Sequence, residues 1–323
     1  MKAHDYYPGV KKWKWYPEDL AGMLGLPHVG NIFYVDPANG NDTSNSGTSQ
    51  NDALATIFAA EAKLTDYNHD VVILVPGANG ASQESVAITW DKNYAHLIGN
   101  AAPTWYGPRA RMDFITDSTD PCMTISGSGC RFLNVKIETT QANNDVLVNM
   151  TGDRNYFNNV HFQGQANSES GDDATSRSLV LTGSHENRFD NCTFGNDTVQ
   201  MSTTNTRLEL AGASKNFFDG CTFIMNADNT GATHVKSTGV GGCEGFNRFN
   251  DCLFMTKWTN LGNQILGNFD LSAQTSSAWI AMTGNNMSIG ADDWEAAASN
   301  ILYFDAQVGY GNAAFIGLAL NQT

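Results

Sequence analysis

The chain has 323 residues, of which 16% are charged, and it carries a formal net charge of −15 with an isoelectric point near 4.7. This acidic balance argues against a nucleic acid partner. No stretch approaches the roughly 20 consecutive apolar residues that a membrane-spanning helix needs. The low charge and the many Asn, Thr, Ser and Gly residues favour turns and sheet faces over long amphipathic helices.

Residues 1–30 contain an aromatic and basic cluster in a chain that is otherwise acidic. Its members are Lys11, Lys12, Trp13, Lys14, Trp15 and Tyr16. We expect residues 1–30 to be an N-terminal arm, which either covers the first coil of its own fold or grips a partner or a neighbouring subunit. No apolar run of 7–15 residues follows the lysines, so we expect no signal peptide and synthesis in a cytoplasm.

The next segment predicts a strand, a helix and a second strand. Ile32–Val35 is the first strand, and Asp36 to Gln50 is a polar turn. A helix is predicted from Asp52, with Asn51 as its N-cap. Its buried face is expected to consist of Leu54, Ile57, Phe58 and Leu64. Residues 70–77, DVVILVPG, contain a continuous apolar run closed by Pro-Gly, which suits a strand buried on both faces. We expect the helix to cap the open N-terminal end of the fold.

A unit of about 30 residues recurs through the middle of the chain, a period typical of solenoids. The copies are residues 145–162, 177–194, 206–223 and, more loosely, 234–254. Each copy has an alternating apolar run, a Gly, a polar turn with an Asn, and a second run that ends in Phe. Alternation predicts strands, and the variable period places insertions in loops. A β-sandwich is the alternative, but sandwich strands do not repeat a sequence.

Stacked coils place like residues about 4.8 Å apart, so the repeat predicts ladders of side chains. One internal ladder is Phe162, Phe194, Phe223 and Phe254. Beside it lie Val160, Cys192, Cys221 and Cys252, and we expect these cysteines to be small buried apolar residues. A third ladder is Asn155, Asn187, Asn216 and Asn247, whose amides are expected to bond to the next coil. Asn also tolerates the left-handed backbone that a sharp corner needs.

Three further segments complete the domain organisation. Residues 164–177 predict a polar, acidic surface loop. Residues 279–289 resemble one more coil, with Gly284 in the Gly position of the repeat. Asn300 to Leu320 is apolar and Gly-rich, and it is expected to form terminal strands or to pack against another chain. The predicted units are therefore the arm at 1–30, a capped solenoid at 31–290 and a C-terminal apolar segment at 291–323.

The opening of the chain carries a family resemblance. Tyr34-Val35-Asp36, Gly40-Asn41-Asp42 and Thr56-Ile57, continued by residues 71–77, resemble the opening of right-handed parallel β-helix proteins of the pectate-lyase-like superfamily. The fuller pattern over residues 30–115 is similar to β-helix proteins encoded in tailed-bacteriophage structural modules. The resemblance implies an all-β, right-handed parallel β-helix. Its motifs are cap and turn residues, so they carry no chemistry.

The resemblance points to a fold that often hosts polysaccharide lyases and glycosidases, and glycosidases need two carboxylates about 5–5.5 Å or 6.5–9.5 Å apart. The best candidates, Glu169, Asp172 and Asp173, share one Ser/Gly-rich loop and are expected to be solvated charges. Asp190, Asp219 and Asp251 recur with the repeat, which indicates a turn or ladder role. Glu209 and Lys236 are expected to face outward without a visible partner. We predict no catalytic residue, although an enzyme whose site is assembled across coils stays open.

Histidines and cysteines give no metal signature. The six cysteines and seven histidines lie at no metal-binding spacing. His161 and His185 are expected to be exposed strand or turn residues. We therefore predict no metal and no cofactor.

The resemblance implies a virion protein of a tailed bacteriophage. We expect a non-enzymatic capsid decoration or cement protein that binds the major capsid protein as a homotrimer, with Lys11 to Tyr16 as contact residues. The alternative is a tailspike-type protein that binds or cleaves host polysaccharide. A secreted carbohydrate-binding β-helix is disfavoured by the lack of a signal peptide.

Overall fold

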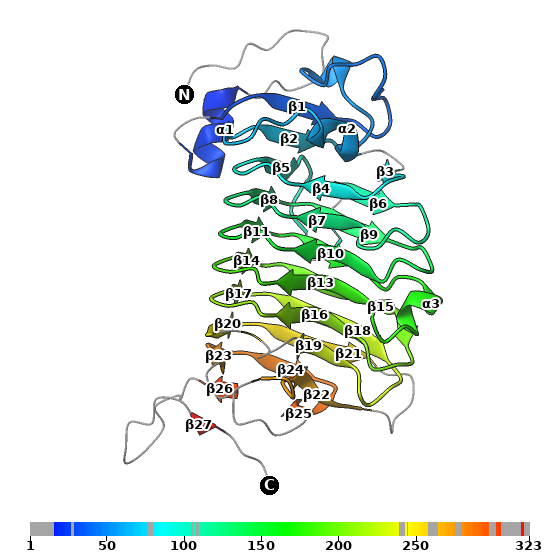
Figure 1. Ribbon diagram of the computed structural model, residues 1–323, viewed down its shortest axis with the longest axis vertical. Coiled ribbons are helices and arrows are strands. Elements are labelled where there is room, and N and C mark those ends of the chain that lie inside the picture. The colour runs from blue at the N-terminus through cyan, green and yellow to red at the C-terminus, as the bar shows by residue number, and fades with distance from the viewer. Residues whose placement is uncertain are drawn as a thin grey trace.

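The computed structural model describes residues 16–26, 29–76, 80–104, 106–107, 110–238, 243, 245–257, 264–274, 279–296, 302–304 and 318–319. Its strands form three sheets wound into one elongated stack (Figure 1). All strand pairs are parallel except the last, between β26 and β27. The predicted right-handed parallel β-helix is confirmed. None of the helices in these ranges is long and apolar enough to cross a membrane.

The three sheets are named here by the order of their strands. Sheet I consists of β1 (Ile32–Val35), β2 (Val71–Leu74), β5 (His96–Gly99), β8 (Arg131–Leu133), β11 (Tyr156–Asn158), β14 (Arg188–Asp190), β17 (Phe217–Asp219), β20 (Phe246–Asn250), β23 (Trp279–Thr283), β26 (Leu302–Phe304) and β27 (Leu318–Ala319). Sheet II consists of β4 (Ile88–Trp90), β7 (Met123–Ile125), β10 (Val146–Met150), β13 (Arg177–Thr182), β16 (Thr206–Ala211), β19 (Thr233–Ser237), β22 (Ile265–Asp270) and β25 (Ala291–Glu295). Sheet III consists of β3 (Ser82–Glu84), β6 (Arg111–Phe114), β9 (Lys136–Thr139), β12 (His161–Gln163), β15 (Thr193–Met201), β18 (Thr222–Ala227), β21 (Leu253–Lys257) and β24 (Met287–Ile289).

Each regular coil runs from sheet II to sheet I and then to sheet III, as β10, β11 and β12 do. The corner between sheets I and III is tight, and its first residue has a left-handed backbone. Asn159 and Asn191 occupy this corner with φ of 51° and 52°, a conformation that Asn tolerates. The connections from sheet III back to sheet II vary in length. The connection from sheet II to sheet I is also longer before β20 and β23 than before β14 and β17, so insertions in the repeat fall at two corners of the coil.

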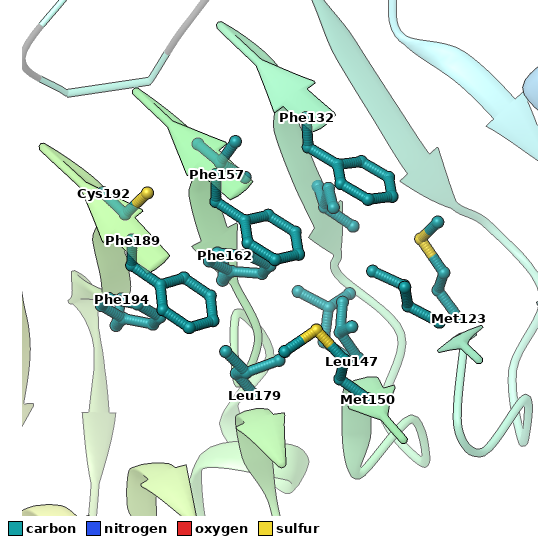
Figure 2. Close-up of a cluster of buried hydrophobic side chains, with 14 of the residues drawn as sticks. Met123, Phe132, Leu147, Met150, Phe157, Phe162, Leu179, Phe189, Cys192 and Phe194 are labelled. Atoms are coloured by element: carbon teal, nitrogen blue, oxygen red, sulfur yellow. The ribbon is translucent and has the colours of Figure 1, made fainter. Parts of the chain in front are cut away.

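The interior is filled by two columns of stacked phenylalanine rings (Figure 2). In the predicted column, the ring centroids are 5.3, 4.7 and 4.8 Å apart from Phe162 through Phe194 and Phe223 to Phe254. The second column was not predicted. It consists of Phe132, Phe157, Phe189, Phe218 and Phe249, at 4.8, 4.7, 4.8 and 4.6 Å. Its signal is the Phe that precedes an Asn or Asp in most copies of the second run.

The six cysteines are free and buried, as predicted. The thiols of Cys221 and Cys252 each donate to a carbonyl of the preceding coil, those of Phe189 and Phe218, over 3.3 Å. Burial raises the pKa of both thiols well above the ordinary value. These cysteines therefore behave as small, uncharged core residues.

The asparagine ladder is confirmed, but its backbone is not left-handed. Asn187 and Asn216 are fully buried, and the Asn187 amide donates to Oδ1 of Asn216 over 2.9 Å. Asn216 donates in the same way to Asn247 over 3.0 Å. The left-handed residues are instead those before the ladder, such as Glu186 and Lys215, with φ of 60° and 57°. The ladder side chains face inward because the preceding residue makes the turn.

Helix α1 (Pro17–Leu24) lies within the predicted arm and packs on the outer face of sheet I (Figure 1). Leu20 and Leu24 are 1% exposed and contact the outward side chains of β2, among them Val71 and Ile73. The guanidinium of Arg131 donates to the carbonyl of Leu24 at the C-terminal end of the helix. Residues 17–24 are thus part of the packed fold.

The helix predicted from Asp52 begins later and is shorter. A 3₁₀ turn, η1 (Gln50–Asp52), is followed by extended Ala53, and α2 (Ile57–Glu61) begins after Thr56. The reason is local competition, because the carboxylate of Asp42 accepts from the amides of Ala55 and Thr56 over 2.7 and 3.1 Å. The Thr56 hydroxyl then caps α2 by accepting from the Ala59 amide.

The buried face of this segment was only partly predicted. Ile57 and Leu64 are buried against β1 and β2, as expected, and so is Leu54. Phe58 is 45% exposed, which contradicts the prediction. The helix has only five residues, and in this short helix the side chain of Phe58 points away from the core.

The C-terminal coils differ in register from the expectation. Trp279–Thr283 pairs with β20, so it belongs to sheet I, and Gly284 with φ of 68° occupies the corner between sheets I and III. It does not take the Gly position of the repeat. β25 lies beyond residue 290 and joins sheet II. From the apolar segment, β26 and β27 are described, and they extend sheet I.

Candidate functional site: the outer face of sheet II

A shallow cleft of about 400 Å³ lies on the outer face of sheet II. Its lining residues are Asp120, Pro121, Val146, Asn149, Thr175, Arg177, Val180 and Glu209. Strand alternation explains the arrangement. Asn149, Val180 and Glu209 pair in register on consecutive strands and all point away from the core. The chain from sheet III to β13 supplies Thr175 at the rim.

Glu209 and Lys236, for which the sequence showed no partner, both have one. Arg177 Nε lies 2.5 Å from Oε2 of Glu209, and the Thr238 hydroxyl donates to Oε1. Lys236 Nζ lies 3.2 Å from Oδ2 of Asp270. The sequence did not reveal these partners because they come from neighbouring coils, about 30 residues away in the chain. The pair of Arg177 and Glu209 places fixed charges of both signs in the cleft.

Arg177 is the most constrained group of the cleft. Its side chain is 8% exposed. Besides Glu209, its Nη1 donates to the carbonyls of Ala174 and Ser176 over 2.8 and 2.7 Å. The guanidinium is therefore held rigidly, with several donors already satisfied.

The acidic loop candidates lie beside this cleft but do not form a carboxylate pair. Glu169 in α3 (Ser168–Gly171) and Asp172 are exposed, as predicted. Asp173 Oδ1 accepts from the amide and hydroxyl of Thr175 over 2.7 and 2.6 Å, which lowers the pKa of Asp173. Asp145, which was not predicted, has a raised pKa because of burial and the nearby Asp173 and Asp120.

The repeated aspartates have the structural role that their recurrence indicated. On the outer face of sheet I, Arg188 bridges Asp190 and Asp219 over 2.8 and 3.2 Å. Arg248 adds a contact to Asp219 over 3.3 Å. Asp251 occupies a left-handed corner, with φ of 52°. None of the three faces the cleft.

A second charged group, on the outer face of sheet III, was missed by sequence reasoning. Asp113 and Glu138 pair directly in register, and Lys136 Nζ lies 2.5 Å from Oε2 of Glu138. Burial, and then the charge of Glu138, raise the pKa of Asp113 to about 6. The shared alternation of Arg111-x-Asp113 and Lys136-x-Glu138 was the available signal. Glu138 is only 7% exposed, so access from solvent is limited.

His161 is buried, which contradicts the expected exposure. It is 1% exposed, and its Nε2 lies 2.8 Å from the carbonyl oxygen of Gly195. Burial lowers the pKa of His161 to about 3. The ring of Tyr106 packs against it at 4.8 Å. Tyr106 lies 55 residues earlier in the chain, so the sequence around His161 does not reveal this contact. His185 is half-buried in a turn, beside Ser214.

The remaining predictions concern metals and the arm. In the part of the chain that the structure describes, no group of three or more His, Cys, Asp or Glu could hold a metal ion. Lys11, Lys12, Trp13, Lys14 and Trp15 lie outside the described residues. Tyr16 is 37% exposed and immediately precedes α1.

Comparison with known proteins gives the fold alone. No protein-family model and no curated protein matches the chain. A pectin methylesterase mutant solved in complex with a hexasaccharide is 15% identical, with a TM-score of 0.51 over 80% of this chain and 81% of that chain. The penultimately deglycosylated form of a pectin methylesterase from Aspergillus niger is 12% identical, with a TM-score of 0.50 over 87% of this chain and 92% of that chain. The ORF18 product of Geobacillus virus E2 is 9% identical, with a TM-score of 0.44 over 91% and 65%. The first two likenesses support a parallel β-helix.

Proposed function

We propose that this β-helix is a non-enzymatic structural protein of a tailed-bacteriophage virion. It decorates the shell as a homotrimer, and it binds the major capsid protein through the arm segment Lys11 to Tyr16. The sequence resemblance over residues 30–115 supports the virion role. The observation that supports trimer formation is the exposure of large apolar side chains in the last coils.

Large apolar side chains emerge from the C-terminal coils on all three sheets. Leu266 on β22 is 48% exposed, Trp279 on β23 is 41% exposed, and Met287 and Ile289 on β24 are 58% and 45% exposed. Together they are four of the ten exposed large hydrophobic residues of the described ranges. Exposed apolar side chains that gather at one end of the stack favour a contact between this end and another chain.

The outward side chains of sheet III change abruptly from polar to apolar along the stack. One outward row reads Arg111, Lys136, His161, Thr193, Thr222, Leu253 and Met287 from the N-terminal to the C-terminal end. The row is polar until Thr222 and apolar after it. A closed ring of three subunits needs two different surfaces on each chain, because one face contacts the other face of the next copy. Apolar residues on several sides of one end suit that geometry.

The test is a double substitution, Met287→Ser with Ile289→Ser, in the full chain. Light scattering should show loss of the trimer mass, and co-sedimentation with undecorated capsids should weaken. The matched control is Phe58→Ser, which removes an aromatic ring of similar exposure from α2 at the other end of the stack. A double variant that keeps both the trimer mass and capsid binding would contradict the proposal.

A second candidate function is polysaccharide binding in the cleft of sheet II, and the cleft itself favours it. Asn149, Thr175 and Glu209 offer hydrogen-bonding groups beside the apolar Val180 and Pro121. Such a mixture suits a sugar, which has hydroxyl edges and apolar faces. The pectin methylesterase with the same fold was solved with a hexasaccharide.

Equilibrium binding to host polysaccharide tests this candidate. Asn149→Ala with Thr175→Ala should weaken binding about tenfold or more, because each removes a polar contact of about 1 kcal/mol. Thr89→Ala, an exposed residue on the same face outside the cleft, is the matched control. Equal binding by the cleft variant and the control would exclude the cleft.

A further inference from the structure

Three aromatic side chains lie together at the turns that lead into β2 and β5. Tyr67 and Tyr94 are 66% and 41% exposed, with ring centroids 5.8 Å apart and planes tilted by 49°. The ring of His69 lies 5.1 Å from that of Tyr94. We call Tyr67 and Tyr94 the tyrosine pair. Exposed rings in contact with each other form a surface that can accept a ligand.

The backbone at the pair is strained. Tyr67, His69 and Tyr94 have φ of 59°, 55° and 56°, a region that bulky residues seldom occupy. Gly129 takes the position of Tyr94 in the next coil, since both lie two residues before paired residues of sheet I, and it adopts φ of 70° without penalty. The turn therefore requires a left-handed residue but not an aromatic one. The same position is left-handed at Arg154, Glu186 and Lys215 in later coils, so the turn belongs to the repeat and only the aromatic side chains are particular to this surface.

Neighbouring coils hold the tyrosine pair in place. The amides of Tyr67 and Tyr94 donate to the carbonyls of Asn93 and Ser128 over 3.1 and 2.9 Å. A Cβ on Gly129 would lie 2.5 Å from Cε1 of Tyr94, so the ring rests on a glycine of the next coil. The pair is thus positioned before any ligand arrives, which lowers the entropy lost on binding.

The charge around the pair is negative. Asp66 precedes Tyr67, and its Oδ1 accepts from the Asn93 amide over 2.7 Å. Asp66, Glu61 and Asp91 all act electrostatically on Lys92, which is itself ion-paired with Asp91. Three carboxylates thus act on one ammonium group, in a chain with a net charge of −15.

We infer that the tyrosine pair binds an arginine or lysine side chain presented by a basic protein partner. Aromatic faces attract cations through their quadrupole, and the surrounding carboxylates concentrate positive groups at the surface. A neutral sugar would gain nothing from the negative charge. The inference goes beyond the proposed virion role and does not depend on it, because it rests on this surface alone.

The probes are two short peptides of equal length, one with arginine and the other with citrulline, which replaces the guanidinium by a neutral urea. NMR titration of the full chain should show at least about tenfold tighter binding of the arginine peptide at low salt, and salt should weaken it. A neutral glucose hexamer is the third probe. Equal binding of both peptides, or binding of the hexamer in place of the arginine peptide, would overturn the inference.

Substitutions separate the site from folding. Tyr67→Ala and Tyr94→Ala should each weaken arginine-peptide binding severalfold, whereas Tyr67→Phe should keep it because the ring face remains. Phe58→Ala, at another exposed ring, is the control and should bind as the wild type does. Tyr67→Gly should leave the melting temperature unchanged or higher, since it relieves the left-handed strain, while it loses binding. Unchanged binding in both alanine variants would also overturn the inference, whatever the capsid experiments give.

Discussion

At the residue scale, the fold depends on side chains that repeat at one position of each coil. Each stacked Phe contacts the equivalent ring above and below, and each ladder Asn gives and receives hydrogen bonds between coils. A single replacement therefore affects three coils together.

Phe223→Ala should lower the free energy of unfolding by about 3–5 kcal/mol, as for other fully buried aromatic residues. Phe223 is 0% exposed and stacks between Phe194 and Phe254. Urea denaturation measures the change. Phe58→Ala, at a 45% exposed ring, should change stability little. A Phe223 variant as stable as the wild type would mean that the internal face is wrongly assigned.

The pH dependence of stability should reveal Asp113. Its pKa in the folded chain is about 6, above the ordinary 3.8, because of burial and Glu138. Between about pH 4 and 6 the folded state therefore binds more protons than the unfolded state, and stability falls as the pH rises. Asp113→Asn, which stays neutral, should match the wild type below pH 4 and become more stable above pH 6, in thermal melts across this range.

Asp117→Asn is the control with the opposite sign. The carboxylate of Asp117 accepts from the amide and the side chain of Asn143 over 2.8 and 2.7 Å, which lowers its pKa. This group adds stability above its ordinary pKa. Its removal should therefore destabilise the protein above pH 4, and the same trend for both variants would reject the assignment of Asp113.

At the scale of elements, the regular coils could be predicted from the sequence and the covering elements could not. The Phe ladder follows from one repeated position. The burial of His161 depends on Tyr106, and the partner of Glu209 is Arg177. These contacts join coils that differ in length, so local spacing does not define which residues meet. Helix α1 was missed because its apolar residues pack on the outer face of β1, β2 and β5, which precede the regular repeats.

The packing of α1 changes the expected result of deleting the N-terminal arm. Removal of residues 1–15 should leave the melting temperature unchanged and should weaken attachment to undecorated capsids. Removal of residues 1–30 should also lower stability, because Leu20 and Leu24 are buried on sheet I. Trp13→Ala with Trp15→Ala should reproduce most of the loss of attachment, since aromatic anchors dominate interfaces.

Light scattering, thermal melts and co-sedimentation compare the two truncations. If the shorter truncation binds capsids as well as the full chain does, the contact lies elsewhere. The apolar surface around Met287 and Ile289 is then the next candidate.

At the scale of the whole molecule, the described charges do not form an open acid–base pair. In the cleft, Glu209 is paired with Arg177; beside it, Asp173 has a lowered pKa, and Asp145, whose pKa is raised, accepts from the Ser176 hydroxyl over 3.3 Å. Asp113, with its raised pKa, lies on another sheet beside the buried Glu138. General acid catalysis near neutral pH needs a protonated group within reach of the substrate.

The isolated protein should therefore release neither reducing ends nor unsaturated uronates from host polysaccharide. A colorimetric assay and absorbance of the unsaturated product measure both. Turnover that Asp172→Asn or Asp173→Asn abolishes would instead identify a depolymerase.

The uniform corner between sheets I and III makes the length of this protein adjustable in discrete steps. In the coils that contain Asn134, Asn159, Asn191, Gly220 and Asp251, the corner between sheets I and III begins with one left-handed residue, and the variation in length falls at the other two corners. Duplication of one genetic unit, such as residues 177–205, would insert a complete rung whose faces match both neighbours. Each such event would lengthen the rod by about 4.8 Å. The length of the β-helix can thus change during evolution while the sequences of both ends stay the same.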